Sequence, residues 1–372
     1  MHDFQFHHPT KVIFSVGSIE NSGNESAAFG KRALIITSGQ ATLKIGILNR
    51  LIEILKKSNI NVFSLDPFQG EPSVTYVDSA VKQATEYEPD LVIGLGGGSA
   101  IDAAKAISAC LASSRNITYF LSNPLVVQQA LPIVAIPTTI GSGSEVSRGS
   151  VITDVTQNIK RGLYNDFLIP KLAIIDPQLS ITLPPRATAL IGFDLLSAAI
   201  ESFFSRKSNL YTHMLSLEII SKVYQNLPAA VKDGSNLEAR INLAFASLLT
   251  GYNLVYSGTC LPHRIQYALG SHPGMTHPLG IAALFPAWFS LAAKTEPAKL
   301  ASISKAIGVS ESQVVKTLLA FRNELKINVH LADFHILSPD IPQLVNKVGG
   351  DLKSDPAYKG NKTIEFILTQ SL

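Results

Sequence analysis

The sequence predicts an α/β protein with two domains, the first built on a parallel sheet with helices on both faces and the second built from helices alone. In the first half of the chain, short apolar runs rich in β-branched residues alternate with segments of helical spacing. The apolar runs are continuous, which is typical of parallel strands buried on both faces. Strand signals disappear after about Asp176, and the rest of the chain carries apolar residues at helical spacing. This order of elements favours a doubly wound α/β domain followed by a helical domain.

The expected strands of the first domain are apolar runs separated by segments of helical spacing. The runs place strands at residues 32–38, 61–65, 90–97 and 132–137, with residues 11–17 as an additional edge strand or hairpin. The segments between them place helices at residues 41–57, 77–87 and 101–112. Strands connected through helices in this way run parallel to one another.

The second half of the chain contains three long segments of helical spacing. They read LPPRATALIGFDLLSAAIESFF, YTHMLSLEIISKVYQNL and ARINLAFASLLTGYNLV. Turn-forming residues in DPQ and LPPR, between residues 177 and 184, indicate the domain boundary. Because a chain of 372 residues is long for a single core, we expect two domains, at residues 1–178 and 179–372.

Composition excludes several classes of protein. The net charge is only +3 and the basic residues are scattered, which argues against nucleic acid or an anionic membrane as a partner. The N-terminal segment MHDFQFHHPT lacks the apolar region of a secretory signal, and no stretch approaches the roughly 18 uninterrupted apolar residues of a membrane helix. The two cysteines, Cys110 and Cys260, cannot form a disulfide framework. We therefore expect a cytoplasmic protein of enzyme size.

Two loops of small residues follow predicted strands. The segment VIGLGGGSAIDAAKA runs from a strand into a helix, and the helix N-terminus can bind phosphate through its free N–H groups. Ser99 stands where the usual dinucleotide fingerprint has its third glycine, so a plain strand-to-helix turn is the alternative. The segment IPTTIGSGSEVS also follows a strand and combines hydroxyls with glycines, although an irregular loop has the same composition. Together the loops predict a phosphate and ribose site at the carboxyl edge of the sheet.

A single carboxylate, Asp194, lies in the apolar segment IGFDLLSAAIES. Asp is a preferred N-cap residue, so a structural role in starting a helix is one explanation. The other is metal binding together with His263 and His277, which flank the segment HRIQYALGSHPGMTH, because imidazole is a common ligand of transition metals. No short spacing of histidines supports this second interpretation, so the fold would have to bring the residues together.

In chain order, these motifs resemble those of the iron-containing (group III) alcohol dehydrogenase family, which is related to glycerol dehydrogenase and dehydroquinate synthase. GLGGGSAIDAAKAI is similar to the family's GGGS-x-x-D-x-x-K loop, and IPTTIGSGSEVS to its PTT-x-GTGSE segment. LAIIDPQLSITLPP, ATALIGFD and HRIQYALG resemble the segments that carry the family's metal site. The resemblance covers nearly the whole chain. It implies an N-terminal Rossmann-like domain and an all-α C-terminal domain, as in dehydroquinate synthase, with the active site in the interdomain cleft.

The resemblance also implies a set of metal ligands. The family binds one divalent metal through an Asp, a His four residues later, and two further His residues fourteen apart. Asp194, His263 and His277 match three of these positions, whereas Ala198 stands at the second and offers no ligand. We expect iron or zinc to bind more weakly through the three residues that remain. His272 is an alternative replacement ligand, and Tyr267 stands where members of the family carry His or Tyr. Without a metal, His263, His277 and Tyr267 would act as catalytic donors or acids.

The resemblance implies a nicotinamide cofactor. NAD-preferring relatives have an Asp after the first strand that binds the ribose 2′-hydroxyl, but here Ser38 and Gly39 follow that strand. A missing carboxylate removes repulsion against a 2′-phosphate, so NADP is favoured, with NAD as the alternative. The expected cofactor-binding residues are Ser38, Gly39, Gly96, Gly97, Gly98, Ser99, Asp102, Thr138, Thr139, Ser142 and Ser144.

The implied activity is the reversible NAD(P)H-dependent reduction of an aldehyde or ketone to an alcohol by an oxidoreductase that acts on a small molecule. Arg148, Lys160 and Arg161 follow the second loop and can bind an anionic substrate, or can be solvated surface cations. Three alternatives remain: a metal-independent reductase similar to maleylacetate reductase, a lyase similar to dehydroquinate synthase, and a non-catalytic nucleotide-binding protein. Relatives form dimers and larger assemblies, so the resemblance implies a homo-oligomer.

Overall fold

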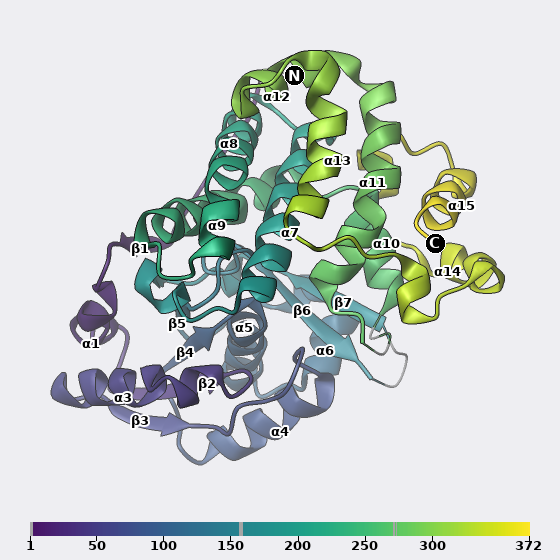
Figure 1. The fold of residues 1–372 in the computed structure, drawn as a ribbon. Helices are drawn as coiled ribbons and strands as arrows, with labels where there is room; N and C mark the ends of the chain where they lie inside the picture. The colour runs from purple at the N-terminus through teal and green to yellow at the C-terminus, as the bar shows by residue number, and fades with distance from the viewer. Residues whose placement is uncertain (1–2, 156–158, 271, 273) are drawn as a thin grey trace. The chain divides into compact units, whose positions relative to one another are not determined.

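The computed structural model describes residues 3–155, 159–270, 272 and 274–372. The chain forms two compact units, one at His7–Thr182 and the other at Leu183–Leu372 together with Met1–Phe6. The predicted boundary at 178/179 lies four residues before the observed one, and the prediction places the N-terminal residues in the first domain. Figure 1 shows the strands gathered in the unit at 7–182, and the long helices in the unit at 183–372.

The unit at 7–182 is built on a six-stranded parallel sheet of order β1-β8-β5-β4-β2-β3. Its strands are β1 (Lys11–Phe14), β2 (Arg32–Thr37), β3 (Asn61–Ser64), β4 (Leu91–Gly96), β5 (Ile133–Pro137) and β8 (Leu172–Ile175). Its helices are α1 (Ser22–Ser26), α2 (Ala41–Lys44), α3 (Ile47–Lys57), α4 (Val74–Thr85), α5 (Gly98–Ser113) and α6 (Ile117–Ser122). A separate antiparallel hairpin joins β6 (Gly149–Asp154) to β7 (Ile159–Tyr164).

Strand β2 shows why this sheet is covered on both faces. Leu34 and Ile36 pack into a core with residues of α4, α5 and the hairpin. Ala33 and Ile35 pack into a second core on the other face, with residues of α3. Side chains alternate along a strand, so a continuous apolar run supplies both cores at once. The predicted doubly wound α/β domain is confirmed.

Three features of this unit differ from the sequence predictions. The helix expected at 41–57 is interrupted at Gly46, which has φ +78°, so α2 and α3 are separate helices. The hairpin β6–β7 was not predicted, because its strands carry charged and glycine residues. The segment 11–17 contains the edge strand β1, whose neighbour β8 also went unpredicted. With only four residues, β8 gives a short strand signal.

The unit at 183–372 is helical throughout the part that the structure describes. Its helices are α7 (Pro185–Phe204), α8 (Leu210–Lys232), α9 (Leu237–Ser257), α10 (Leu261–Leu269), α11 (His277–Thr295), α12 (Leu300–Ile307), α13 (Val314–Glu324), α14 (Ile341–Lys347) and α15 (Asn361–Gln370). By length and composition alone α7 could cross a membrane, but 83% of its most apolar window is buried inside the protein. Helix α7 is therefore a core helix, and the predicted all-α second domain is confirmed.

Candidate metal centre and cofactor loops

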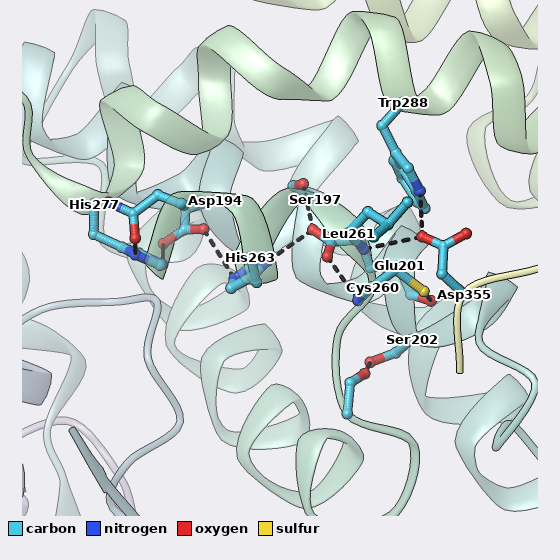
Figure 2. Close-up of polar contacts among 12 residues, drawn as sticks. Asp194, Ser197, Glu201, Ser202, Cys260, Leu261, His263, His277, Trp288 and Asp355 are labelled. Carbon is cyan, nitrogen blue, oxygen red and sulfur yellow. Dashed lines mark hydrogen bonds and ion pairs between the residues drawn. The ribbon is translucent and has the colours of Figure 1, made fainter. Parts of the chain in front are cut away.

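Asp194, His263 and His277, called here the metal triad, lie together although α7, α10 and α11 each supply one of them. The Nε2 atom of His263 lies 3.5 Å from Asp194 Oδ1, and the Nε2 atom of His277 lies 3.7 Å from Asp194 Oδ2. One ligand atom from each residue lies within 4.8 Å of the others. Figure 2 shows the Asp194 carboxylate between the two imidazoles. The fold thus brings together three residues that lie far apart in the sequence.

Both imidazoles are oriented by a hydrogen bond at Nδ1. His263 Nδ1 donates to Glu201 Oε1 at 2.8 Å, and His277 Nδ1 donates to Gln266 Oε1 at 2.6 Å. A proton on Nδ1 leaves Nε2 as the atom with a free lone pair. Both Nε2 atoms face Asp194, so the two rings are arranged as metal ligands with polar partners behind them. Gln266 and Glu201 were not among the predicted site residues, because neither lies beside a predicted ligand in the sequence.

Position 198 supplies no donor in the structure. Ala198 follows Asp194 by one helical turn on α7, and its residue is 4% exposed. Residues four apart share one face of a helix. The metal triad therefore consists of one carboxylate and two imidazoles.

Glu201 is fully buried and connects α7 to the start of α10. Its Oε2 accepts a hydrogen bond from the backbone N–H of Cys260 at 2.9 Å, and its Oε1 accepts one from Ser197 Oγ at 3.0 Å. Burial lowers the pKa of His263, but the adjacent Glu201 and Asp194 carboxylates outweigh it and raise the pKa above its ordinary value. The electrostatic environment of His263 is thus set by two carboxylates from one helix.

Two further predicted residues, His272 and Tyr267, lie outside the metal triad. His272, considered as a replacement ligand, has its Nε2 atom 2.8 Å from the backbone oxygen of Phe334. Among the residues that the structure describes, the ligand atoms that lie within 4.8 Å of one another belong to Asp194, His263 and His277, and His272 is not among them. The ring of Tyr267 lies 6.0 Å from the ring of His277, so Tyr267 stays beside the metal triad as a predicted catalytic residue.

In the unit at 7–182, the loops after β2, β4 and β5 converge at the carboxyl edge of the sheet. A Cβ atom on Gly98 would lie 2.7 Å from the Ser142 side chain, and one on Gly97 would lie 3.1 Å from Thr139 Oγ1. Gly96 has φ +148°, and a Cβ atom on it would approach Ala100 and the Ser38 hydroxyl. The glycines at 96–98 therefore allow three loops to meet closely.

The strand order places this edge at a ligand-binding position. Strand β2 lies between β3 and β4, so the chain changes direction across the sheet between β2 and β4. Ligands bind at such a switch point, beyond the carboxyl ends of the strands. The N-cap of α5, Gly97, makes no side-chain capping bond, and Gly97, Gly98 and Ser99 are half-buried next to buried neighbours. Phosphate can approach the helix N-terminus there.

The structure shows Asp102 holding the second loop in place. Its Oδ1 accepts a hydrogen bond from Ser144 Oγ at 2.5 Å, and its Oδ2 accepts one from the Val151 N–H at 2.9 Å. Lys105, which is fully buried, donates to Ser144 Oγ, Ser147 O and Gly149 O at 2.7–2.9 Å. Asp102 and Lys105 therefore act together as a clamp that fixes residues 144–151 on α5.

The three predicted substrate cations are all paired with carboxylates of their own unit. Arg148 lies 3.3 Å from Asp166, Lys160 lies 2.7 Å from Glu71, and Arg161 lies 3.5 Å from Asp154. The Lys160 side chain is only 4% exposed, whereas Arg148 and Asp166 are 45% and 76% exposed. Exposed pairs contribute little energy, so Arg148 can exchange its partner most easily.

Comparisons with known proteins agree with both parts of the chain. A family model described as iron-containing alcohol dehydrogenase matches residues 9–177, and the C-terminal model of the Fe-containing alcohol dehydrogenase family matches residues 188–371. The chain therefore belongs to the iron-containing alcohol dehydrogenase family. Members of this family are oxidoreductases, and the predicted family, fold class and oxidoreductase function are confirmed.

Individual relatives resemble the chain over most of their length. It is 32% identical to NADH-dependent butanol dehydrogenase A of Clostridium acetobutylicum over 77% of this chain and 75% of that protein. It is 30% identical to sulfoacetaldehyde reductase of Bilophila wadsworthia over 91% of this chain and 90% of that protein. The crystal structure of an iron-containing alcohol dehydrogenase from Thermotoga maritima superimposes with a TM-score of 0.90 at 31% identity, covering 100% of this chain and 99% of that one. The expected homo-oligomer and cytoplasmic location stay predictions.

Proposed function

We propose that the chain reversibly reduces a small aldehyde or ketone to an alcohol with NAD(P)H, using a divalent metal held by the metal triad. The observation that carries the proposal is the convergence of Asp194, His263 and His277, whose ligand atoms lie within 4.8 Å of one another. Two imidazoles and one carboxylate with open positions suit iron(II), and three protein ligands also suit catalytic zinc. The donor set therefore fits iron, the metal in the family name, and also fits zinc.

The residues of this chain would prepare the site for hydride transfer. A bound divalent metal supplies Lewis-acid stabilisation of the negative charge that develops on the substrate oxygen. Glu201 and Gln266 hold the rings of His263 and His277 in the tautomer that has the proton on Nδ1 and none on Nε2. Because Ala198 offers no side-chain donor, a metal held by the triad would keep an open coordination position. Tyr267 is proposed as a proton donor to the alkoxide.

The proposed cofactor is NADP(H), with NAD(H) as the alternative. The segment from Ser38 to Gly46 contains no carboxylate and includes one cation, Lys44. A 2′-phosphate therefore meets no negative charge in this segment, and the second loop, which contains Thr138 and Thr139, lies at the same edge of the sheet. One relative is named as NADH-dependent, so activity is to be measured with both NADPH and NADH.

An anionic aldehyde is the proposed substrate class, with Arg148 as the residue that binds its charged group. Support comes from the exposed Arg148–Asp166 pair and from a relative named for sulfoacetaldehyde, whose sulfonate is anionic. Arg148→Ala is expected to raise the Michaelis constant for an anionic aldehyde and to leave that for a neutral aldehyde unchanged. Equal Michaelis constants for the anionic aldehyde in the two proteins would contradict this role.

The main test is metal content of gently purified protein, measured together with aldehyde-dependent oxidation of NADPH and NADH before and after chelation. We expect a bound metal, loss of activity to the chelator, and recovery with Fe(II) or Zn(II). Turnover that resists chelation in metal-free protein would instead favour a metal-independent reductase, the alternative that Ala198 supports. Asp194 would then have a structural role.

A further inference from the structure

Two buried carboxylates hold the first residues of α10, the helix that carries His263. Glu201 Oε2 accepts a hydrogen bond from the Cys260 N–H, and Asp355 Oδ2 accepts one from the Leu261 N–H, each at 2.9 Å. Both carboxylate residues are 0% exposed. Free N–H groups at a helix N-terminus favour negative charge, so each carboxylate stabilises the start of α10.

The second oxygen distinguishes the two carboxylates, as Figure 2 shows. Glu201 Oε1 accepts hydrogen bonds from His263 Nδ1 at 2.8 Å and from Ser197 Oγ at 3.0 Å. The partners of Asp355 are different, since its Oδ1 accepts from the Ala357 N–H at 2.7 Å and its Oδ2 also accepts from Trp288 Nε1 at 2.7 Å. The two residues are thus matched in burial and in helix contact, but Glu201 also contacts the metal triad.

We propose that Glu201 is a positioning residue that fixes His263 in the Nδ1–H tautomer and holds its Nε2 atom toward Asp194. The inference rests on the proposed metal site and names a residue that this site requires. Glu201 follows Asp194 by seven residues, about two turns along the same face of α7. His263 therefore lies between two carboxylates of one helix, with Glu201 at Nδ1 and Asp194 3.5 Å from Nε2. Because both carboxylates belong to α7, the helix fixes their separation and holds the ring of His263 from both sides.

Glutamine has the shape of Glu201 but cannot reproduce its hydrogen bonds. Glu201 accepts bonds at both oxygens, from His263 and from Cys260, whereas Gln offers one acceptor and one donor. If the amide NH₂ faces His263, Nδ1 must become the acceptor and the proton moves to Nε2, which can then no longer bind a metal. If the NH₂ faces Cys260 instead, two donors meet in a buried position. Glu201→Gln therefore disturbs the tautomer of His263 or the start of α10.

The test compares Glu201→Gln with the matched control Asp355→Asn. Zn²⁺ affinity is measured by competition with a chromophoric chelator, and thermal unfolding records the loss of stability. We expect Glu201→Gln to weaken Zn²⁺ binding by about 10- to 100-fold, the usual effect of removing the partner behind a metal-binding His. Asp355→Asn is expected to lower stability comparably and to leave Zn²⁺ affinity nearly unchanged, because Asp355 does not contact His263 in the structure.

Nitrogen-15 NMR of metal-free protein provides the second readout, with the His263 signals assigned by their loss in His263→Ala. At a pH where the imidazoles are neutral, we expect the Nδ1–H tautomer in the wild type and a larger share of Nε2–H in Glu201→Gln. An unchanged tautomer together with wild-type Zn²⁺ affinity would overturn the proposal. A wild type that binds no Zn²⁺ would contradict the proposed metal site, and the tautomer measurement would still decide the role of Glu201.

If Glu201→Gln does not fold, Glu201→Asp serves in its place. Aspartate keeps the charge but draws the carboxylate back by one methylene, which lengthens the contact with Nδ1. We expect Zn²⁺ binding weakened several-fold and a mixed tautomer population. Wild-type values in both measurements would overturn the role of Glu201.

Discussion

Single residues decide how complete the proposed metal site is, and Ala198 is the clearest case. It lies one turn after Asp194 on α7 and is 4% exposed. Ala198→His places an imidazole where it can join the metal triad as a fourth ligand. We expect Zn²⁺ affinity to rise at least about tenfold, measured by chelator competition, because a fourth protein ligand replaces a water.

The matched control for this substitution is Ala198→Leu, which adds similar bulk without a donor. Overpacking of a buried site costs about 1–3 kcal/mol in either variant, so both are expected to unfold at a lower temperature without metal. Added Zn²⁺ should raise the unfolding temperature of Ala198→His by more than it raises that of the wild type. Equal Zn²⁺ affinity in the His and Leu variants would show that position 198 does not face the metal.

Gly39 gives a second prediction at this scale, for nucleotide choice. It follows β2 with φ +62°, and a Cβ atom on it would meet no atom within 4 Å, so a side chain has room. Asp and Asn both tolerate this backbone conformation better than other residues. Gly39→Asp is expected to weaken NADPH binding by about tenfold or more through repulsion of the 2′-phosphate, measured by fluorescence titration. Gly39→Asn adds a side chain of the same size without the charge, so it should weaken NADPH binding much less. Equal losses of NADPH affinity in the two variants would contradict a position of the 2′-phosphate near Gly39.

Among the elements, helix α5 holds the loop after β5, the second of the two proposed cofactor loops, through the clamp formed by Asp102 and Lys105. Burial lowers the pKa of Lys105 to about 8, while Asp102 and Glu145 nearby oppose that shift. Lys105→Met leaves the carbonyls of Ser147 and Gly149 without their donor. We expect a loss of about 3 kcal/mol in urea unfolding, together with weaker NADPH binding. Unchanged NADPH affinity in a destabilised Lys105→Met would limit the clamp to a structural role.

The same loop gives the chain a pH dependence through Glu145, which is 1% exposed. Burial raises the pKa of its carboxyl from 4.5 to about 7. A raised pKa means that the folded state holds the proton more tightly, so this stabilisation is complete below pH 4.5 and is lost as pH rises through about 7. Glu145→Gln removes the effect. Its stability relative to the wild type should therefore rise by up to about 3 kcal/mol between pH 4.5 and 7, measured by urea unfolding. If the free energies of unfolding of the two proteins change equally with pH, Glu145 is not the source of this pH dependence.

At the scale of elements, the sequence predicted what depends on local pattern. Continuous apolar runs located β2, β4 and β5, since strands buried on both faces need apolar residues at every position. The hairpin β6–β7 was missed because its strands include charged side chains such as Lys160, which is buried through a pair with Glu71 far away in sequence. The resemblance supplied Asp194, His263 and His277. Neither pattern nor resemblance indicated that Glu201 and Gln266 would stand behind the histidines, because that depends on how α7, α10 and α11 pack.

Over the whole molecule, the proposed metal site and the proposed cofactor site belong to different units, so we expect the units to respond to different ligands. All members of the metal triad belong to the unit at 183–372, and the glycine loops belong to the unit at 7–182. A ligand that binds only the folded state slows hydrogen exchange by up to about 100-fold at 100 times its dissociation constant. We expect Zn²⁺ to protect α7, α10 and α11 most strongly, and NADPH to protect residues 96–102 and 138–144, measured by exchange mass spectrometry. Asp194→Asn should remove the Zn²⁺ effect and keep the NADPH effect. Zn²⁺ protection that persists in Asp194→Asn would place the metal elsewhere in the chain and would return Asp194 to a purely structural role in α7.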